Sequence, residues 1–240
     1  PEGLFEIWIS CFAKRVVSPR PPLLLAVHLQ EVGGKRFHNS MCHARAFVNR
    51  LTTALEPHGL TTRLAFIDDE NDSAKFTALG SIYFVHCSVA ASVRIWNFKS
   101  GSFDFLNEHS RVHLQEDLEP VVTVHKHKFS PDMTPMQRSS RKGFLRTRWQ
   151  LAENLIPIEL INVHLFHDES NFVAMQQFPS LYSEGRRRAL RFALDRVGTA
   201  LDDNEPRSNE QNLPDAFFIF GDFNFRYKIK TDVLIECQHL

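Results

Sequence analysis

Short, nearly continuous apolar runs that end in polar residues constrain the fold of this chain more than any other feature. Residues 22–30, PLLLAVHLQ, form one such run and close on Glu31, Gly33 and Gly34. A run without alternation is typical of a strand that is buried on both faces and followed by a turn. Similar apolar segments predict further strands at 76–85, 93–98, 144–152, 160–166 and 216–220.

Two other segments have helical spacing. Apolar residues recur along 40–56, and Pro57 and Gly59 end that pattern. A second helix is predicted at 181–201, and we expect its early arginines to lie on a solvent-exposed face: Arg186, Arg187, Arg188 and Arg191. Segments 104–140 and 202–214 lack periodicity and are predicted to be irregular. Strands interspersed with amphipathic helices predict a single α/β domain.

Composition excludes several classes of protein. The 240 residues carry 28 basic and 28 acidic side chains, which argues against a generally basic nucleic-acid coat. Hydrophobic residues make up 43% of the chain, too many for a disordered polar chain, and no apolar run approaches the ~18–20 residues of a membrane-spanning helix. The four cysteines are scattered without zinc spacing, which favours a reduced, cytoplasmic protein.

Polar residues of catalytic type gather where the predicted strands end. They are Gln30 and Glu31 after the first strand, Asn162, His164 and His167 in and after INVHLFH, and Asp222 and Asn224 after FFIFG. Carboxylates and amides are costly to bury unpaired, and ligand sites in α/β sheets favour the carboxyl ends of strands. One such residue alone can simply cap a turn. Three clusters from distant parts of the chain predict a shared site.

The types of residue suit phosphoryl chemistry. Mg²⁺ takes oxygen ligands and keeps several waters, so Glu31 can serve as one ligand. Asp222 can deprotonate a water, while Asn224 and His164 can stabilise developing negative charge. No Gly-rich phosphate loop with GK[ST] is present, which argues against a nucleotide-driven kinase or ATPase. The missing G-x-S-x-G elbow argues against an α/β-hydrolase.

Five segments resemble the inositol polyphosphate 5-phosphatase family, in the family's order and across most of the chain: HLQEVGGK (28–35), FTALGSIYF (76–84), SRKGFLRTRW (140–149), INVHLFHDESNFVA (161–174) and FIFGDFNFRYK (218–228). The GDxN element is shared by the wider DNase I-like superfamily. The NxHLxxH pattern and the Phe225-Arg226 continuation favour the phosphatases. The resemblance is strongest to the type I branch, which acts on inositol 1,4,5-trisphosphate, and it implies a DNase I-like α/β sandwich of two packed sheets flanked by helices.

The resemblance assigns roles to matching residues. Glu31 matches the metal-binding glutamate, His164 the histidine at the scissile phosphate, Asp222 the aspartate that activates water, and Asn224 the asparagine of the transition-state network. Four residues are expected to contact the substrate: Lys142, Asn162, His167 and Arg226. The basic segment also contains Arg141, Arg146 and Arg148, and alternation along a strand puts about half of such residues on the other face.

The chain departs from the family pattern at both ends. No T-x-N-x-G-like segment precedes Gln30, and no P-x-W-C-D-R-like or D-H-x-P-V-like segment follows Asp222. The expectation is therefore a partial catalytic domain over 1–240, inactive by itself, whose family enzyme hydrolyses the 5-phosphate of soluble inositol polyphosphates with Mg²⁺ and so ends calcium-mobilising signalling.

Three alternative functions stay open, and the interpretation also leads to expectations about partners. The chain can instead belong to a superfamily phosphodiesterase, either an abasic-site endonuclease or a sphingomyelinase, or be a non-catalytic interaction fragment. Zero net charge weakly opposes a nuclease, so no nucleic-acid partner is expected. Membrane association, at the plasma membrane, is expected only through a C-terminal lipidation signal that this chain lacks.

Overall fold

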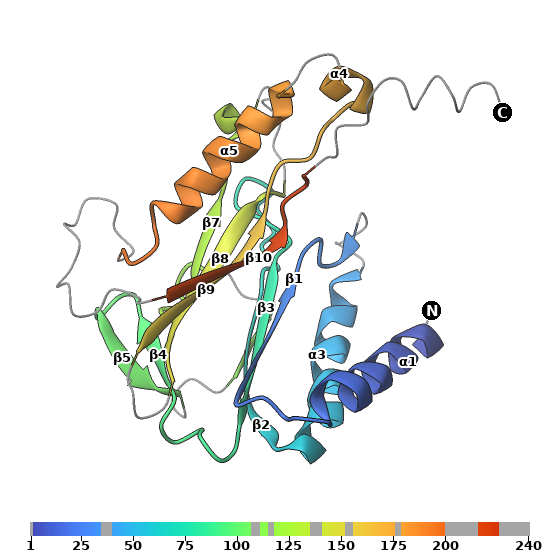
Figure 1. Cartoon of the computed structure of the whole chain (residues 1–240), viewed down its shortest axis with the longest axis vertical. Helices are drawn as coiled ribbons and strands as arrows, with labels where there is room; N and C mark the ends of the chain where they lie inside the picture. Colours follow the sequence, from blue (N-terminus) through green and yellow to red (C-terminus); the bar gives the residue numbers. More distant parts are fainter. Residues whose placement is uncertain are drawn as a thin grey trace.

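The computed structural model describes residues 2–34, 40–106, 111–114, 118–134, 141–151, 156–175, 179–199 and 216–225. Two β-sheets pack against each other, and helices cover their outer faces (Figure 1). The N-terminal helix α1 and helix α3 lie beside the first sheet, and α5 lies beside the second. This arrangement confirms the predicted α/β sandwich.

The first sheet, sheet A, has the strand order β1-β3-β2-β6. Its strands are β1 (Leu24–Leu29), β2 (Leu60–Ile67), β3 (Gly80–His86) and β6 (Val112–His113). The central strand β3 runs antiparallel to both of its neighbours. Sheet A is flanked by α1 (Glu2–Phe12), the π-helical turn η1 (Ala13–Val17), α3 (Cys42–Leu55) and the 3₁₀ turn η3 (Glu56–His58).

The second sheet, sheet B, has the strand order β10-β9-β8-β4-β5, and β7 also pairs with β8. Its strands are β4 (Arg94–Asn97), β5 (Ser102–Phe105), β7 (His125–Lys128), β8 (Gly143–Gln150), β9 (Pro157–His164) and β10 (Ala216–Asp222). Strand β9 is antiparallel to β8 and parallel to β10. The remaining elements are η5 (Pro131–Met133), α4 (Asn171–Met175) and α5 (Leu181–Leu194).

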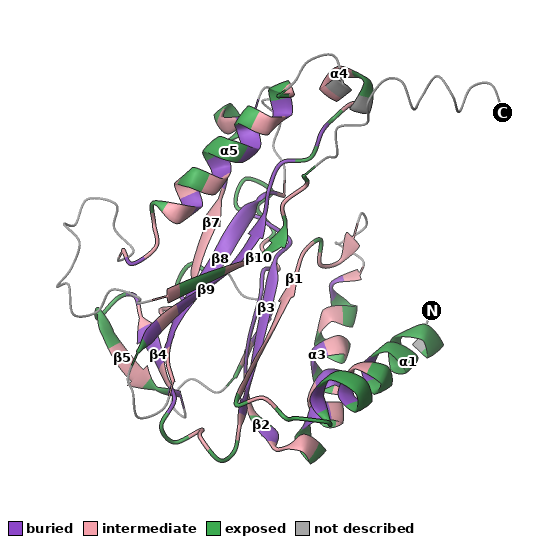
Figure 2. Cartoon of the chain, viewed as in Figure 1, coloured by how far each residue is buried: buried purple, intermediate pink, exposed green. Residues whose placement is uncertain are grey.

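Alternation along the strands divides the core into three layers. On β3, Tyr83 and Val85 face sheet B, where they pack with Trp149 and Leu160, while Ile82 and Phe84 face the helices beside sheet A. A third cluster joins sheet B to α5. The middle strands are therefore buried on both faces (Figure 2), and this explains their unbroken apolar sequences.

Two of the strands predicted to be buried are edge strands instead. Strand β1 is half-buried along its whole length, and on β10 the rings of Phe217, Phe218 and Phe220 are exposed. Their edges lie next to each other, with the His28 and Phe220 rings 5.2 Å apart. An apolar run predicts a strand, but the position of that strand in the sheet depends on pairings that the run does not encode.

The other elements agree unevenly with the sequence predictions. The helix predicted at 40–56 is α3, which ends at Leu55, and Gly59 ends the following turn η3 in the left-handed conformation at φ 80°. The helix predicted at 181–201 ends earlier, at Leu194. The segment 104–140, predicted to be irregular, contains β6 and β7. Helix α1 and strand β2 form in segments where the sequence patterns predict no element. The predicted loop at 202–214 lies outside the described residues.

Two half-buried histidines of the sheets, His28 and His125, contribute to a dependence of stability on pH. Burial lowers the pKa of His28 to about 4. Burial, reinforced by Arg146 and other nearby cations, lowers the pKa of His125 to about 2. As the pH falls below 6.5, both rings take up protons in the unfolded chain. In the folded chain each ring stays neutral until the pH approaches its lowered pKa. Stability is therefore full above pH 6.5 and falls as the pH drops below it.

We expect the free energy of unfolding, measured with urea, to fall by roughly 2 kcal/mol per half-buried histidine between pH 7 and pH 5. A His125→Gln variant should show a shallower pH dependence, because its side chain does not titrate. The matched control is His43→Gln, which changes an exposed histidine at the start of α3. Equal pH slopes for all three proteins would contradict the assignment.

Candidate active site

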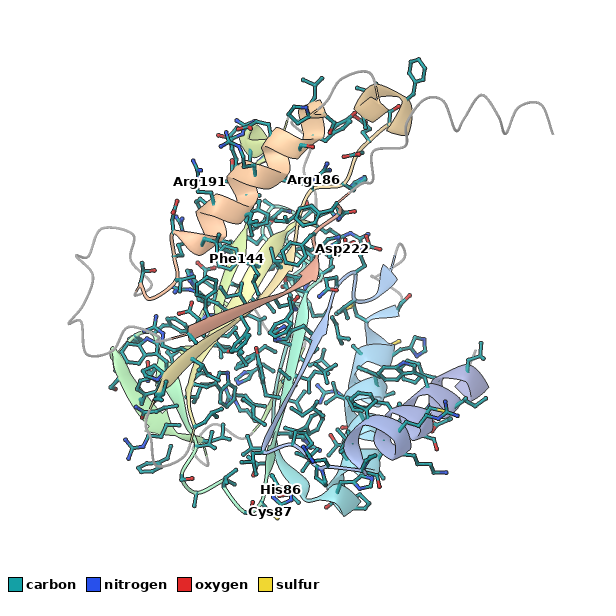
Figure 3. The ribbon with its side chains drawn as sticks, viewed as in Figure 1. His86, Cys87, Phe144, Arg186, Arg191 and Asp222 are labelled. Atoms are coloured by element: carbon teal, nitrogen blue, oxygen red, sulfur yellow. The ribbon has the colours of Figure 1, made fainter. Side chains whose placement is uncertain are left out.

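The register of β9 brings distant segments of the chain to one point. His164, the last residue of β9, lies opposite Asp222 on β10 and opposite Gly143 on β8. Lys142 immediately precedes Gly143, so it reaches the same end of the sheet. Figure 3 shows Asp222 at the end of β10 near β1, whose own end leads to Glu31. Three strands of sheet B and one strand of sheet A thus deliver the candidate residues.

Two positions beside His164 must be glycine: Gly143, which lies opposite His164 on β8, and Gly221, which precedes Asp222 and lies opposite Val163 on β10. A Cβ atom on Gly143 would lie 2.2 Å from the carbonyl oxygen of His127. One on Gly221, beside Asp222, would lie 1.9 Å from the carbonyl oxygen of Val163, and Gly221 also has a φ of +139°. The backbones of β8 and β10 therefore approach their neighbours too closely for any side chain. These two glycines let Lys142 and Asp222 come close to His164.

Opposite charges surround the His164 ring. Its Nε2 atom lies 3.5 Å from Oδ2 of Asp222 and 4.0 Å from Oε1 of Glu31, and it contacts the Nζ atom of Lys142. His164 and Lys142 are buried, at 1% and 5% exposure, while the side chains of Glu31 and Asp222 are about half exposed. The site therefore places a buried cation and imidazole beneath two carboxylates that are open to solvent.

The environment keeps His164 neutral. Burial lowers its pKa to about 4, the charge of Lys142 adds to this effect, and Asp222 opposes it. His167 and Arg141 also lower the pKa. At neutral pH, Lys142 therefore supplies the positive charge at this point, and His164 supplies a neutral ring with one N–H group.

Backbone strain is concentrated in the same region. Among the described residues other than glycine, only Glu31, Ala78 and Asn224 have positive φ, between 51° and 55°. Ala78 belongs to the same turn region as Glu31, because its carbonyl accepts a hydrogen bond from the Val32 N–H. Residues held in the left-handed region cost free energy and cluster at functional sites. This signal supports Glu31 and Asn224 independently of any resemblance.

Asn224 is held in place by two hydrogen bonds. Its backbone N–H donates to Oδ1 of Asp222 at 2.8 Å, and its Nδ2 donates to the carbonyl of Leu165 at 2.9 Å. The first bond also fixes the Asp222 carboxylate. These two bonds use the N–H groups of Asn224 and leave its side-chain oxygen available as an acceptor or ligand.

Asn162, a predicted substrate contact, links the two sheets. Its side chain is fully buried between the sheets, and its Nδ2 donates to the carbonyls of Leu29 and Gly80. Its Oδ1 accepts a hydrogen bond from Gln30 at 2.7 Å. With donors and acceptor both used, Asn162 joins sheet B to sheet A and positions the segment that leads to Glu31. A direct contact between Asn162 and the substrate stays a prediction, whereas its role in joining the sheets follows from these bonds.

The basic segment divides by position along β8 and not by face, because Arg146 and Arg148 have the same alternation phase as Lys142. Lys142 lies at the site, and Arg141 donates to the carbonyl of Gly34 at 2.6 Å. Arg146 and Arg148 are buried farther along β8, where both bind Glu159, and so they are remote from the His164 end. His167 is exposed just after β9. Arg226 lies outside the described residues.

The oxygen donors suit a hard divalent cation. The carboxylates of Glu31 and Asp222 both approach Nε2 of His164 and both face solvent. Within the described ranges, no group of three His, Cys, Asp or Glu side chains is arranged to hold a metal. Two carboxylates open to water are a donor set that a hard divalent cation can use while it keeps several waters.

The sequence did not predict the buried ion pair that positions part of the site. Arg186, predicted to lie on a solvent-exposed face, is 5% exposed and turned inward from α5 (Figure 3). It forms a buried ion pair with Asp168 and also donates to the carbonyl of Phe166. Arg187, Arg188 and Arg191 are exposed as predicted. The ion pair joins α5 to the segment that follows His164. The available sequence signal for this pair was Asp168, directly after HLFH, together with an arginine of the predicted helix.

We expect Arg186→Met to lower the free energy of unfolding by about 3–5 kcal/mol, because it leaves the buried Asp168 carboxylate without its partner. Adding Asp168→Asn to that variant should recover part of the loss. Arg187→Met is the matched control on the same helix, since Arg187 is exposed and pairs with exposed Glu184. Urea unfolding measures all of these. Equal losses for Arg186→Met and Arg187→Met would contradict the buried pair.

Known proteins are similar to this chain in sequence and in fold. No family model matches the chain. The human protein named inositol polyphosphate-5-phosphatase A is 36% identical over 99% of this chain and 54% of its own length. A Caenorhabditis elegans protein named probable type I inositol 1,4,5-trisphosphate 5-phosphatase is also 36% identical, over 93% of this chain and 51% of its own.

A solved structure has the same fold. The inositol polyphosphate 5-phosphatase domain of SPsynaptojanin, in complex with inositol (1,4)-bisphosphate and calcium, has a TM-score of 0.50 and 15% identity, and the match covers 96% of this chain and 52% of that one. The chain thus spans about half the length of the curated relatives it matches. On its sequence over nearly all 240 residues, the chain belongs to the inositol polyphosphate 5-phosphatase family.

Proposed function

We propose that these residues form part of the active site of a Mg²⁺-dependent phosphatase that removes the 5-phosphate of inositol polyphosphates, with inositol 1,4,5-trisphosphate as the substrate. One observation carries the proposal: Glu31, Lys142, His164 and Asp222, from four strand ends, meet around a single imidazole nitrogen. The names of the relatives and the fold of the solved neighbour support it.

The residues divide the work of phosphate hydrolysis. Asp222, half exposed and fixed by the Asn224 N–H, can accept the proton of a water that attacks phosphorus. Lys142 places a buried positive charge where the phosphoryl oxygens gain negative charge, and the neutral His164 ring accepts a hydrogen bond from Lys142 and so positions it. Glu31 would hold Mg²⁺, which supplies further stabilisation of negative charge on the phosphoryl oxygens.

The substrate carries a dense negative charge, and the local charges suit it. The chain has no net charge, so attraction must come from a patch rather than from the whole surface. Lys142 and Arg141 are basic side chains at the His164 end. We retain His167 and Arg226 as expected substrate contacts. The rival functions, abasic-site cleavage, sphingomyelin hydrolysis and a purely interacting role, become outcomes of the test.

Phosphate release from inositol 1,4,5-trisphosphate tests the function. The assay compares the chain alone with a protein that joins it to the part of the human relative outside the match. We expect the joined protein to release phosphate with Mg²⁺, to lose this activity with a chelator, and to leave abasic DNA and sphingomyelin intact. A joined protein that unfolds cooperatively but hydrolyses no inositol phosphate would contradict the proposal.

In the joined protein, Asp222→Asn should lower kcat by roughly 10²–10⁴-fold, because the amide cannot accept the proton of water. Its structure and substrate KM should change little, since asparagine has the same shape. Asp104→Asn, on β5 at the far edge of sheet B, is a matched control. Near-normal turnover in Asp222→Asn would assign the general base to another residue.

Lys142→Met should lower kcat/KM by roughly 10–150-fold, the value of one charge-assisted hydrogen bond lost at the phosphoryl oxygens. Lys99→Met, in the exposed turn between β4 and β5, changes the same charge away from the site and should leave kcat/KM unchanged. Equal effects of the two variants would show that only overall charge matters.

A further inference from the structure

We propose that helix α1 binds to membrane surfaces, with its outward face in the interface of an anionic bilayer. The proposal goes beyond the phosphatase function and does not depend on it. It rests on an apolar stripe that the rest of the fold leaves exposed, and on the basic residues that continue this stripe.

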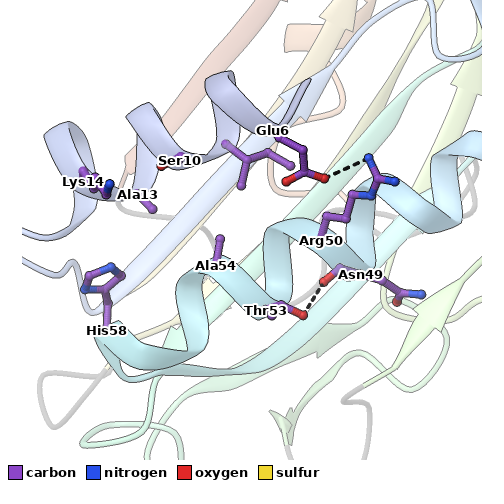
Figure 4. A pocket seen from close by; sticks show the side chains of 10 residues that line it. Glu6, Ser10, Ala13, Lys14, Asn49, Arg50, Thr53, Ala54 and His58 are labelled. Atoms are coloured by element: carbon purple, nitrogen blue, oxygen red, sulfur yellow. Dashed lines mark hydrogen bonds and ion pairs between the residues drawn. The ribbon is translucent and has the colours of Figure 1, made fainter. Parts of the chain in front are cut away.

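The inward face of α1, continued by the turn η1, packs against the fold. Ile9, Ala13 and Val17 are at most 5% exposed and belong to the core beside sheet A. Glu6 forms an ion pair with Arg50 of α3 at 2.9 Å, and Figure 4 shows this pair beside a hollow between the two helices. The helix is therefore held in one orientation, with its opposite face fixed toward solvent.

That opposite face is apolar as well. Leu4, Ile7, Trp8 and Cys11 follow one another at helical spacing, and all four are exposed. Ile7 is 61% and Leu4 74% exposed. Trp8 lies at the border of this face: it stacks on Phe12 with ring centroids 5.4 Å apart, lies 6.1 Å from the ring of Phe47 on α3 and still exposes 47% of its surface. No described side chain of this stripe is acidic.

Charge identifies the occupant. Arg15 lies one turn after Cys11 and continues the stripe, and Lys14 and Arg20 are exposed beside it. None of these three basic side chains forms an ion pair with a described acidic group. Apolar residues with a tryptophan, followed by free cations, match the apolar layer and negative headgroups of an anionic bilayer surface.

The length of the helix sets how it binds. Together α1 and η1 span residues 2–17, about 24 Å at 1.5 Å per residue. Of the helices in the described part of the chain, none has the length and apolar character to cross a bilayer. The helix therefore lies in the plane of the interface, with the folded sandwich attached on the water side.

Trp8 provides a direct readout. The other two tryptophans, Trp96 and Trp149, are buried at 1% exposure or less, so a quencher in lipid chains reports on Trp8. The experiment mixes the whole chain with phosphatidylcholine–phosphatidylserine vesicles whose chains carry bromine, and with plain phosphatidylcholine vesicles. We expect a blue shift and quenching with the anionic vesicles, weakened by high salt.

Variants separate the two parts of the surface. Leu4→Ser with Ile7→Ser keeps the reporter and should lower vesicle partitioning at least about tenfold. Lys14→Glu with Arg15→Glu should lower partitioning to anionic vesicles roughly 30-fold. The matched controls, Ile156→Ser and Lys99→Glu, change exposed residues elsewhere and should bind as the wild type does.

Three results would overturn the proposal. The first is the absence of lipid quenching of Trp8 with anionic vesicles at low salt. The second is equal binding by the α1 variants and their controls. The third is a dimer, detected by analytical ultracentrifugation without vesicles, that Leu4→Ser with Ile7→Ser converts to monomer, because a second copy would then cover the stripe. None of these readouts depends on phosphatase activity.

Discussion

The pairing register of β9 is the constraint on which the rest of the candidate site depends. Side chains alternate along a strand, so a slip by one residue would move His164 to the α5 face and bury it among apolar side chains. Close contacts at Gly143 and Gly221 fix this register on both sides. Asn162 fixes it across the sandwich, because its buried amide is satisfied only when sheet A presents Leu29 and Gly80.

Burial then gives the site its electrostatic character. A histidine among lysine, arginine and carboxylates in water would titrate near neutral pH, but burial and Lys142 hold His164 neutral. The two carboxylates stay half exposed, which lets them meet water and a cation. Arg186 and Asp168 form a second, fully buried pair behind this arrangement. This pair positions the segment after His164.

Much of this arrangement was predictable from sequence. The apolar runs predicted most strands, and polar residues at the strand ends identified His164, Asp222 and Glu31 as neighbours although up to 191 positions separate them. Position within a sheet was not predictable, because the run at 22–30 has the composition of a central strand and forms an edge. Arg186 was misplaced for a similar reason: burial and partners come from tertiary pairing, which a single sequence does not encode.

The most direct test of the central claim observes the histidine side chains of the chain by ¹⁵N NMR while inositol 1,4,5-trisphosphate and Mg²⁺ are added. The account predicts that His164 is neutral at pH 7 and that its ring resonances, with those of His167, shift as the ligand binds. The exposed His43 should not respond, and Lys142→Met should weaken the response. Shifts confined to histidines away from the end of β9, or a charged His164 at pH 7, would contradict the account.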